Sequence, residues 1–409
     1  MLWNGKRRQT LLVERKKGRR RWTAGALACI LTFCATVVPI QAAETDNPAI
    51  SADRLLRTFY VNDEGTLWAW GNNLKGVIDP EHPSMEVGPT KIGENVRTVS
   101  GFLVLKEDGA VYEMDEDAFY RQTKVMDNVV AIDGDTTYNV NLALDNKGNL
   151  YSWGVNYRGA LGFEGGEELI PGENVGGTPY GWKQYTPHKI LDNVQDFCVV
   201  GYGGCAVKKD GTVWAWGESA PYQLGAKDDE GDSVYSWFSE SYKYYTNPVQ
   251  VMSGVKTIIC DRGGVSAIIK PDGSIWTKYT VPPDPWDDSN TSYEWSKRLD
   301  HVVDAASFND GVLCLKDDGT VWGWGKATGI GVKGDTEVGS GMGFFSSDGY
   351  VPDLDRYQSV PVKLMTDVAA IGEGVGLYIV KKDGTVWETV SVGEDSQQYG
   401  TWKEFALSE

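Results

Sequence analysis

The chain has 409 residues, with 39 basic and 57 acidic side chains and a formal net charge of −18 at pH 7. A surface this acidic repels phosphate backbones, so the composition argues against nucleic-acid binding. The chain also has 41% hydrophobic residues and 16 tryptophans, which is enough apolar material for a globular protein with a large core.

Residues 1–43 have the pattern of a secretory signal peptide. Nine Lys or Arg lie within residues 6–21, an uncharged run follows over residues 24–40, and Gln-Ala-Ala at 41–43 forms a small-residue cleavage site. The uncharged run also approaches the length of a membrane anchor. We therefore expect either cleavage near Glu44 or a retained anchor, and in both cases a secreted or cell-surface protein outside the cytoplasmic membrane.

Removal of this leader makes the protein more acidic. The leader contains nine basic residues and one acidic residue, Glu14, so residues 44–409 retain 30 basic and 56 acidic side chains. The resulting net charge is −26, which again argues against a nucleic-acid partner and favours a basic one.

Residues 44–409 consist of copies of one hairpin unit. In its clearest copy, KKDGTVWAWG at residues 208–217, Asp210-Gly211 separates two runs with period-two alternation, which predicts a type I′ turn. Beyond the turn, alternation puts Trp214 and Trp216 on one face of a strand and small residues on the other. We expect both tryptophans to be core residues between stacked sheets.

Seven such turns recur at intervals of 39 to 65 residues, which indicates a repeat architecture. Their glycines are Gly65, Gly109, Gly148, Gly211, Gly273, Gly319 and Gly384. Each unit has room for about four short strands, the content of one propeller blade. The sequence therefore predicts an all-β, seven-bladed β-propeller of four-stranded blades in one domain over residues 44–409. It leaves open which termini share the closing blade.

Two of the cysteines are placed to meet. Cys198 and Cys205 flank a short Gly-rich segment and would face each other across a hairpin. Outside the cytoplasm they form either a disulfide or a pair of small buried thiols.

The units differ most between their third and fourth strands, where insertions fall at residues 163–185, 226–245, 279–295 and 335–357. In an up-and-down meander these insertions emerge on the face opposite the Asp-Gly turns. Aromatic residues amid acidic ones on such loops are typical of recognition surfaces. Alternatively, the loops bury their own aromatic residues, as compact loops do. The predicted binding residues are Trp237, Phe238, Tyr244, Trp286, Trp295, Phe344 and Phe345.

The phrase WGVNYRGALG at residues 153–162 resembles the WG-x-N-x-x-G-x-LG phrase of the regulator of chromosome condensation repeat, and residues 216–225 and 70–76 match it in part. The resemblance implies a seven-bladed propeller and, with the leader, a secreted bacterial member. Repeats of the family usually carry a His after a Gly in the second strand. Here that place reads Gly203-Gly204-Cys205. The difference argues against the role of the family's eukaryotic member, which exchanges nucleotide on a small GTPase.

Enzymatic chemistry finds little support in the sequence. The three histidines, His82, His188 and His301, lie in different units, and no Ser-His-Asp order, zinc spacing or phosphate loop appears. The acidic clusters at 228–230 and 287–288 lack the alternating pattern of a calcium loop. We therefore expect no enzyme, no cofactor and no metal.

The sequence favours a secreted, non-enzymatic module that recognises an unknown, basic protein. Carbohydrate or cell-wall binding through the loop aromatics is the alternative, and a polysaccharide-acting enzyme with a carboxylate pair is a third. No nucleic-acid partner is expected, and a membrane contact only if the leader is retained.

Overall fold

The computed structural model describes residues 49–404, apart from 53–56, 62–63, 84–85, 174–178, 219–220, 222–223, 225–243, 262–263, 278–294, 309–310, 347–348, 374–376, 384 and 393–398. The chain divides into two compact units, residues 1–29 with 406–409 and residues 30–405. All described residues belong to the second unit. The predicted signal peptide lies outside them.

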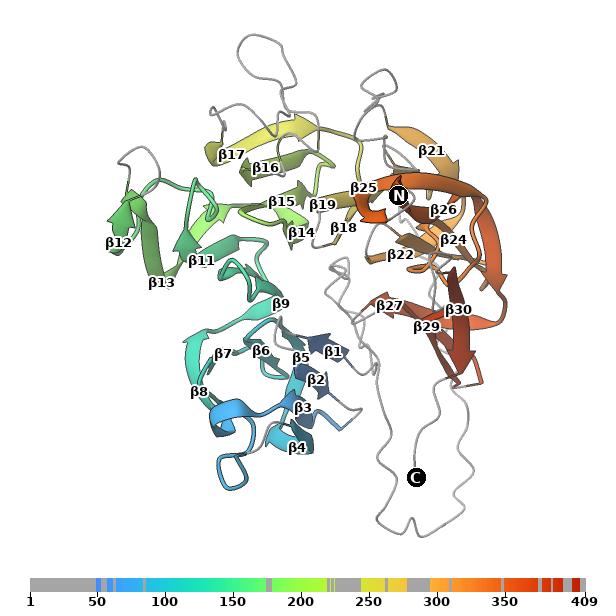
Figure 1. Ribbon diagram of the computed structural model, residues 1–409. Coiled ribbons are helices and arrows are strands. Elements are labelled where there is room, and N and C mark those ends of the chain that lie inside the picture. The colour runs from blue at the N-terminus through green and yellow to red at the C-terminus, as the bar shows by residue number, and fades with distance from the viewer. Residues whose placement is uncertain are drawn as a thin grey trace, which may run out of the picture. The chain divides into compact units, whose positions relative to one another are not determined.

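Seven antiparallel sheets follow one another along the second unit (Figure 1), and we call them blades 1 to 7. Blade 1 contains β1 (Ala49–Ala52), β2 (Arg57–Val61), β3 (Leu67–Asn72) and β4 (Glu86–Gly93), with the 3-10 turn η1 (Leu74–Gly76) before β4. Blade 2 contains β5 (Val96–Ser100), β6 (Leu103–Lys106), β7 (Val111–Asp115) and β8 (Ala118–Met126). Blade 3 contains β9 (Val129–Asp135), β10 (Val140–Asp145), β11 (Leu150–Asn156), β12 (Glu168–Glu173) and β13 (Pro179–Leu191).

The remaining four blades have the same plan. Blade 4 contains β14 (Val194–Val199), β15 (Gly203–Lys208), β16 (Val213–Gly217) and β17 (Tyr245–Met252). Blade 5 contains β18 (Thr257–Asp261), β19 (Gly264–Ile269), β20 (Ile275–Thr277) and β21 (Ser296–Leu299). Blade 6 contains β22 (Val302–Phe308), β23 (Gly311–Lys316), β24 (Val321–Lys326), β25 (Thr336–Ser346) and β26 (Gly349–Met365), and blade 7 contains β27 (Val368–Glu373), β28 (Leu377–Lys381), β29 (Val386–Val392) and β30 (Tyr399–Glu404).

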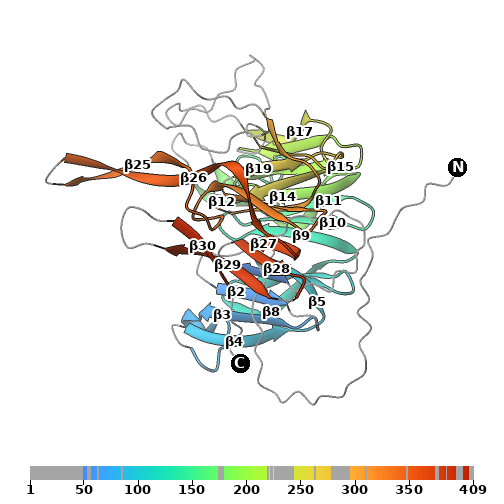
Figure 2. The same ribbon diagram turned by 90° about the vertical axis from the view of Figure 1, so that its right-hand side faces the viewer.

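The strand order confirms the predicted all-β propeller. Five blades have four strands in chain order, and blades 3 and 6 add a fifth strand, β12 or β25, from the insertion between the third and fourth strands. Figure 2 shows β25 and β26 extending together beyond the other strands of blade 6. Every described sheet is one continuous chain segment, so none combines strands from the two ends of the chain.

Consecutive blades are joined along their first strands. The first strand of each blade, from β5 to β22, contacts the first strand of the next, and β1 contacts β5 in the same way. The turn glycine of one blade also accepts a hydrogen bond from a Val that begins the first strand of the next blade or, for Val255, shortly precedes it. Six such bonds are described, with N···O distances of 2.8 to 3.2 Å, from Val96, Val129, Val194, Val255, Val302 and Val368 to Gly65, Gly109, Gly148, Gly211, Gly273 and Gly319.

The turn at Asp210-Gly211 is not type I′, and that prediction is wrong. Gly211 has φ 82°, but Asp210 is not among the residues with positive φ. The Gly211 amide donates to the Lys208 carbonyl at 2.8 Å, which is a type I turn followed by a glycine bulge. The reason is the Asp210 carboxylate, which accepts the amide and hydroxyl of Thr212 at 2.9 and 2.6 Å and thereby holds the aspartate within the turn.

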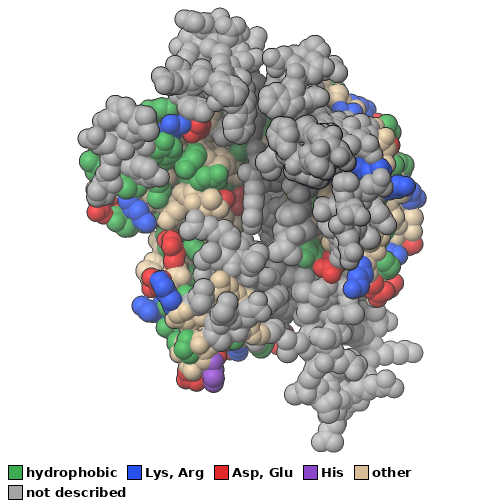
Figure 3. Space-filling view, viewed as in Figure 1, with side chains coloured by type: hydrophobic (Ala, Val, Ile, Leu, Met, Phe, Trp, Pro, Cys, Tyr) green, Lys and Arg blue, Asp and Glu red, His purple; other side chains and the backbone are tan. Residues whose placement is uncertain are grey.

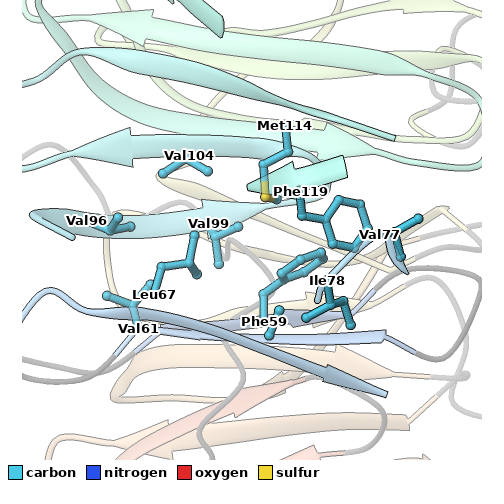
Figure 4. Close-up of a cluster of buried hydrophobic side chains, with 11 residues drawn as sticks. Phe59, Val61, Leu67, Val77, Ile78, Val96, Val99, Val104, Met114 and Phe119 are labelled. Atoms are coloured by element: carbon cyan, nitrogen blue, oxygen red, sulfur yellow. The ribbon is translucent and has the colours of Figure 1, made fainter. Parts of the chain in front are cut away.

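Hydrophobic side chains fill the spaces between blades. Figure 4 shows the cluster between blades 1 and 2, where Phe59 and Phe119 meet edge to face with ring centroids 5.1 Å apart. In blade 4, Trp216 is fully buried in a cluster with Leu142 of blade 3. Trp214 lies on the same side but is only half-buried, so the prediction that both tryptophans are core residues holds fully for Trp216 alone.

The cysteines pair differently from the predicted disulfide. Cys198 and Cys205 do lie opposite each other on β14 and β15, but the disulfide joins Cys198 to Cys260 of blade 5. Cys205 and Cys314 are buried free thiols. The correction has a topological cause, because the contact between β14 and β18 brings a cysteine 62 residues away to Cys198.

Among the described residues, no helix has the length and apolar character needed to cross a membrane.

Candidate binding surface

The predicted binding residues fall into three groups. Trp237, Phe238 and Trp286 lie outside the described residues. Phe344 and Phe345 lie in β25, where they pair with Val351 and Tyr350 of β26.

Tyr244 and Trp295 have opposite environments. Tyr244 directly precedes β17 and is 48% exposed, as a contact residue must be. Trp295 directly precedes β21 and is half-buried against the core cluster that blades 4 and 5 share. At Trp295, therefore, the insertion covers the fold with its own aromatic side chain, which is the alternative that the sequence left open.

Three tyrosines from separate loops meet between blades 3 and 4. Tyr138 lies between β9 and β10, Tyr157 follows β11, and Tyr202 lies between β14 and β15. The Tyr202 ring centroid is 4.3 Å from that of Tyr138 and 4.9 Å from that of Tyr157. All three are half-buried, so each presents part of its surface to solvent. We call them the tyrosine cluster.

Polar contacts fix the orientation of this cluster. The Arg158 guanidinium lies 4.9 Å from the Tyr157 ring centroid and donates to the Glu218 carboxylate at 2.9 Å. The Asp135 carboxylate accepts the backbone amide of Tyr138 at 2.7 Å. Aromatic surface held in this way loses little conformational entropy when a ligand binds to it.

The hairpin of β12 and β13 carries the largest described group of exposed apolar side chains on one insertion. Leu169 is 45% exposed, Trp182 37% and Tyr185 54%. Leu169 and Trp182 are cross-strand partners, and Trp182 also pairs with Asn156 of β11, so the hairpin continues the sheet of blade 3. Figure 3 shows hydrophobic side chains, with a few charged ones among them, over the region of β11 to β13. Leu169 and Trp182 share one face of the hairpin, and we call them the hairpin patch. Tyr185 lies on the other face, where its hydroxyl donates to the Glu168 carboxylate and the Lys183 ammonium is 5.7 Å from its ring centroid.

The base of the hairpin is held by one carboxylate. Glu167 accepts the Gln184 side-chain amide at 2.9 Å, the Thr186 amide at 3.2 Å and the Thr186 hydroxyl. The hydroxyl bond is the main reason that the pKa of Glu167 lies below its ordinary value. The patch therefore stands on a hydrogen-bonded support.

The hairpin patch lies next to the tyrosine cluster. A Cβ on Gly181 would come within 2.9 Å of the Asn156 carbonyl and 3.5 Å of the Tyr157 Cα atom. Blades 3 and 4 also approach each other closely here, because a Cβ on Gly159 would lie 2.7 Å from the Thr246 Cα atom of β17. The backbone segments that carry the two groups are therefore neighbours at the junction of blades 3 and 4.

Sequence reasoning did not single out this surface. The insertion at 163–185 and its phrase GGTPYGWKQY were visible, but the predicted residues came from the insertions of blades 4 to 6. Tyr138 and Tyr202 lie in loops between the first and second strands, where no insertion marks them. Only the spatial contact between these loops identifies them as neighbours of the hairpin.

The histidines lie in three separate places. His82 Nδ1 is 2.9 Å from the Asp79 carboxylate at the surface of blade 1. His188 stacks on Phe163 with ring centroids 4.1 Å apart. His301 has φ 62° in the turn between blades 5 and 6. His82 and His188 thus make contacts within their own blades, and His301 occupies a turn position with positive φ.

The phrase that carries the family resemblance also has a structural role. The Asn156 side-chain amide donates to the carbonyls of Phe163 and Gly165, both at 2.7 Å, and its oxygen accepts the Leu161 amide at 3.1 Å. The loop so formed docks on the next blade, because Trp216 Nε1 donates to the Ala160 carbonyl at 3.0 Å.

Comparisons with known proteins agree with this architecture. No family model matches the chain. Protein pim1 of Schizosaccharomyces pombe is 23% identical over 244 residues, which cover 50% of this chain and 42% of that protein. Human WBSCR16 is 16% identical with a TM-score of 0.54, over 81% of this chain and 86% of that one. Prp20p of Saccharomyces cerevisiae is 16% identical with a TM-score of 0.53, over 80% of each chain.

The chain has the propeller fold of these two structures. The likeness extends the resemblance of the phrase at residues 153–162 to the fold of most of the chain. At these identities it shows the fold, and it assigns no partner.

Proposed function

We propose that this chain is a non-enzymatic module that recognises a protein through the hairpin patch and the tyrosine cluster. The observation that supports this proposal most directly is the hairpin patch, in which the cross-strand partners Leu169 and Trp182 are exposed on a hydrogen-bonded support. Large aromatic side chains bury much area at low entropic cost, and a few of them usually dominate a protein interface.

Two further observations support this proposal. The structure of Prp20p is described together with its binding to Gsp1p and histones, so this fold serves protein recognition in a similar structure. The acidic charge of the chain favours a basic partner, whose association would slow as salt is added. From the leader pattern of residues 1–43 we also propose that this function is carried out outside the cytoplasmic membrane. Insertion aromatics of blades 4 to 6 remain candidate contacts in our proposal: Phe344 and Phe345 of β25, and Trp237, Phe238 and Trp286, which lie outside the described residues.

The proposal is tested by affinity capture with the purified chain, followed by binding measurements on the captured protein. Trp182→Ala should weaken binding at least tenfold, which is the lower range for a dominant interface aromatic, and leave the melting temperature unchanged. Tyr120→Ala is the matched control, because Tyr120 is 44% exposed on β8 of blade 2 and lies outside the surface. It should bind as the unmodified chain does.

Two results would overturn the proposal. Equal affinities of the Trp182 and Tyr120 variants would show that the hairpin patch is not the contact. Binding to a glycan array that Trp182→Ala abolishes, without any protein whose capture depends on Trp182, would instead establish carbohydrate recognition.

A further inference from the structure

Three sulfur atoms converge at the junction of blades 4 and 5. Cys198 lies on β14, Cys205 on β15 and Cys260 on β18. Cys198 and Cys260 form the disulfide, and the Cys205 Sγ atom is 3.1 Å from the Cys198 Sγ atom and 3.9 Å from the Cys260 Sγ atom. We call these residues the cysteine triad.

We propose that the triad, once its disulfide is reduced, binds one thiophilic cation of the Zn²⁺ or Cu(I) class. All three sulfur atoms lie within 4.8 Å of one another. Zinc–thiolate bonds of about 2.3 Å place the sulfurs of a tetrahedral site about 3.8 Å apart. The separation of 3.9 Å between Cys205 and Cys260 already fits that value. Only Cys198 must move away from its neighbours, and reduction permits this.

The arrangement fits a shared cation better than an exchange of disulfide partners. In thiol–disulfide exchange the attacking sulfur lies in line with the bond that breaks, far from the leaving sulfur. Here Cys205 lies beside the disulfide, at similar distances from both of its sulfurs. Three thiolates around a common centre form a ligand set that soft cations select.

The triad is largely buried, and two buried aspartates accept hydrogen bonds from the backbone beside it. Cys198 and Cys205 are buried, whereas Cys260 is half-buried and offers a path of entry. The Asp133 carboxylate accepts the amide of Val199 at 2.8 Å, next to Cys198. The Asp196 carboxylate accepts the amide of Ile258 at 2.9 Å, two residues before Cys260.

A bound cation stabilises thiolates over thiols, so binding should release protons and weaken as pH falls.

The disulfide between Cys198 and Cys260 must be reduced before the triad can bind a cation. A dithiol such as dithiothreitol supplies two electrons and two protons, breaks the Cys198–Cys260 bond to give two thiols, and is itself oxidised to a cyclic disulfide. The three thiols then lose their protons as the cation binds. In the oxidised triad only the Cys205 sulfur remains as a free ligand, so the triad should not bind the cation.

Titration of the full chain with Cd²⁺ tests the proposal, because cadmium thiolates have a strong ultraviolet charge-transfer band. The chain is reduced with dithiothreitol and freed of it under argon before titration. The band should saturate at one Cd²⁺ per chain, disappear when Zn²⁺ competes, and be absent from the oxidised chain. Cys205→Ser should weaken Cd²⁺ binding at least tenfold. Cys314→Ser is the matched control, because Cys314 is a buried free thiol on β23 of blade 6.

Melting curves cover the case in which the reduced Cys205 variant is less well folded. Zn²⁺ should raise the melting temperature of the reduced chain and of Cys314→Ser, since it binds only the folded state, and leave Cys205→Ser unchanged. The proposal is overturned if the reduced chain shows no charge-transfer band. A band or a Zn²⁺-induced shift that persists in Cys205→Ser would overturn it equally, because the cation would then bind elsewhere.

Discussion

Asp133→Asn should remove a pH dependence from the stability of the propeller. Asp133 lies on β9 of blade 3 and joins three blades, since it accepts the Ser100 hydroxyl of blade 2 at 3.0 Å and the Val199 amide of blade 4 at 2.8 Å. Burial raises the pKa of its carboxyl to about 6, despite these two hydrogen bonds. An asparagine retains both contacts, because its oxygen can accept from Val199 and its amide can donate to Ser100.

The magnitude follows from the shift. A rise from 3.8 to about 6 corresponds to about 3 kcal/mol at 1.36 kcal/mol per pKa unit. Because the pKa of the folded state is the higher one, this stabilisation is fully present below pH 3.8 and is lost as pH rises through 6. About 1.4 kcal/mol of it should appear between pH 7.5 and pH 5. As pH falls from 7.5 to 5, the free energy of unfolding of the unmodified chain should therefore increase relative to that of Asp133→Asn.

Urea unfolding of both proteins at several pH values between 5 and 7.5 measures this difference. Asp196 also has a raised pKa through burial, but it is present in both proteins and largely cancels. Asp210→Asn is the control. The Thr212 hydroxyl lowers the pKa of Asp210, so its contribution is lost only as pH falls through that lowered value, below this range. A difference between the unmodified chain and Asp133→Asn that stays constant with pH would refute the assignment.

Two further predictions concern the repeat itself. Gly211→Val should lower the free energy of unfolding by more than about 1 kcal/mol, because φ is 82° there and a β-branched residue rarely adopts it. Gly88→Ala, with open space around the added Cβ, is the control, and equal melting temperatures would contradict the argument. Trp216→Ala should cost about 3–5 kcal/mol because the side chain is fully buried, and Trp214→Ala clearly less. Equal losses in denaturant unfolding would contradict the burial argument.

The fold could be predicted because its signals are local. An Asp-Gly turn between alternating runs is visible in a window of ten residues, and its recurrence gives the number of blades. The turn type was missed, because it depends on the hydrogen bonds from Thr212 to Asp210. The bond from Val255 to Gly211 was missed because it joins two blades.

The candidate surface and the cysteine triad could not be predicted in the same way. Tyr138, Tyr157 and Tyr202 come from three loops of two blades, and no spacing in the sequence relates them. Cys198 and Cys205 were recognised as opposite each other within one hairpin. Cys260 joins them only because neighbouring blades stack, and sequence spacing carries no information about that contact.

In blade 3, the residues that resemble the family repeat and the residues of the proposed binding surface are different ones. A resemblance between repeats therefore identifies the fold and not the partner. The polar groups of the family phrase have structural roles. Asn156 closes the loop through its side-chain hydrogen bonds, and the Ala160 carbonyl accepts a hydrogen bond from Trp216. The outer part of the hairpin, residues 169–181, adds residues that shorter blades lack. Blade 2 shows this directly, because its third and fourth strands, β7 and β8, are joined by only two residues.

Shortening this hairpin should therefore abolish binding and spare the fold. Glu168 and Lys183 are cross-strand partners, so an Asn-Gly dipeptide in place of residues 169–182 can join them in a tight hairpin. The change removes Leu169 and Trp182, and it keeps the bond between Glu167 and Gln184 at the hairpin base. The shortened chain should melt as the full chain does and lose its protein partner. If it melts early, the hairpin stabilises the blade, and if it binds normally, recognition lies on another face of the propeller.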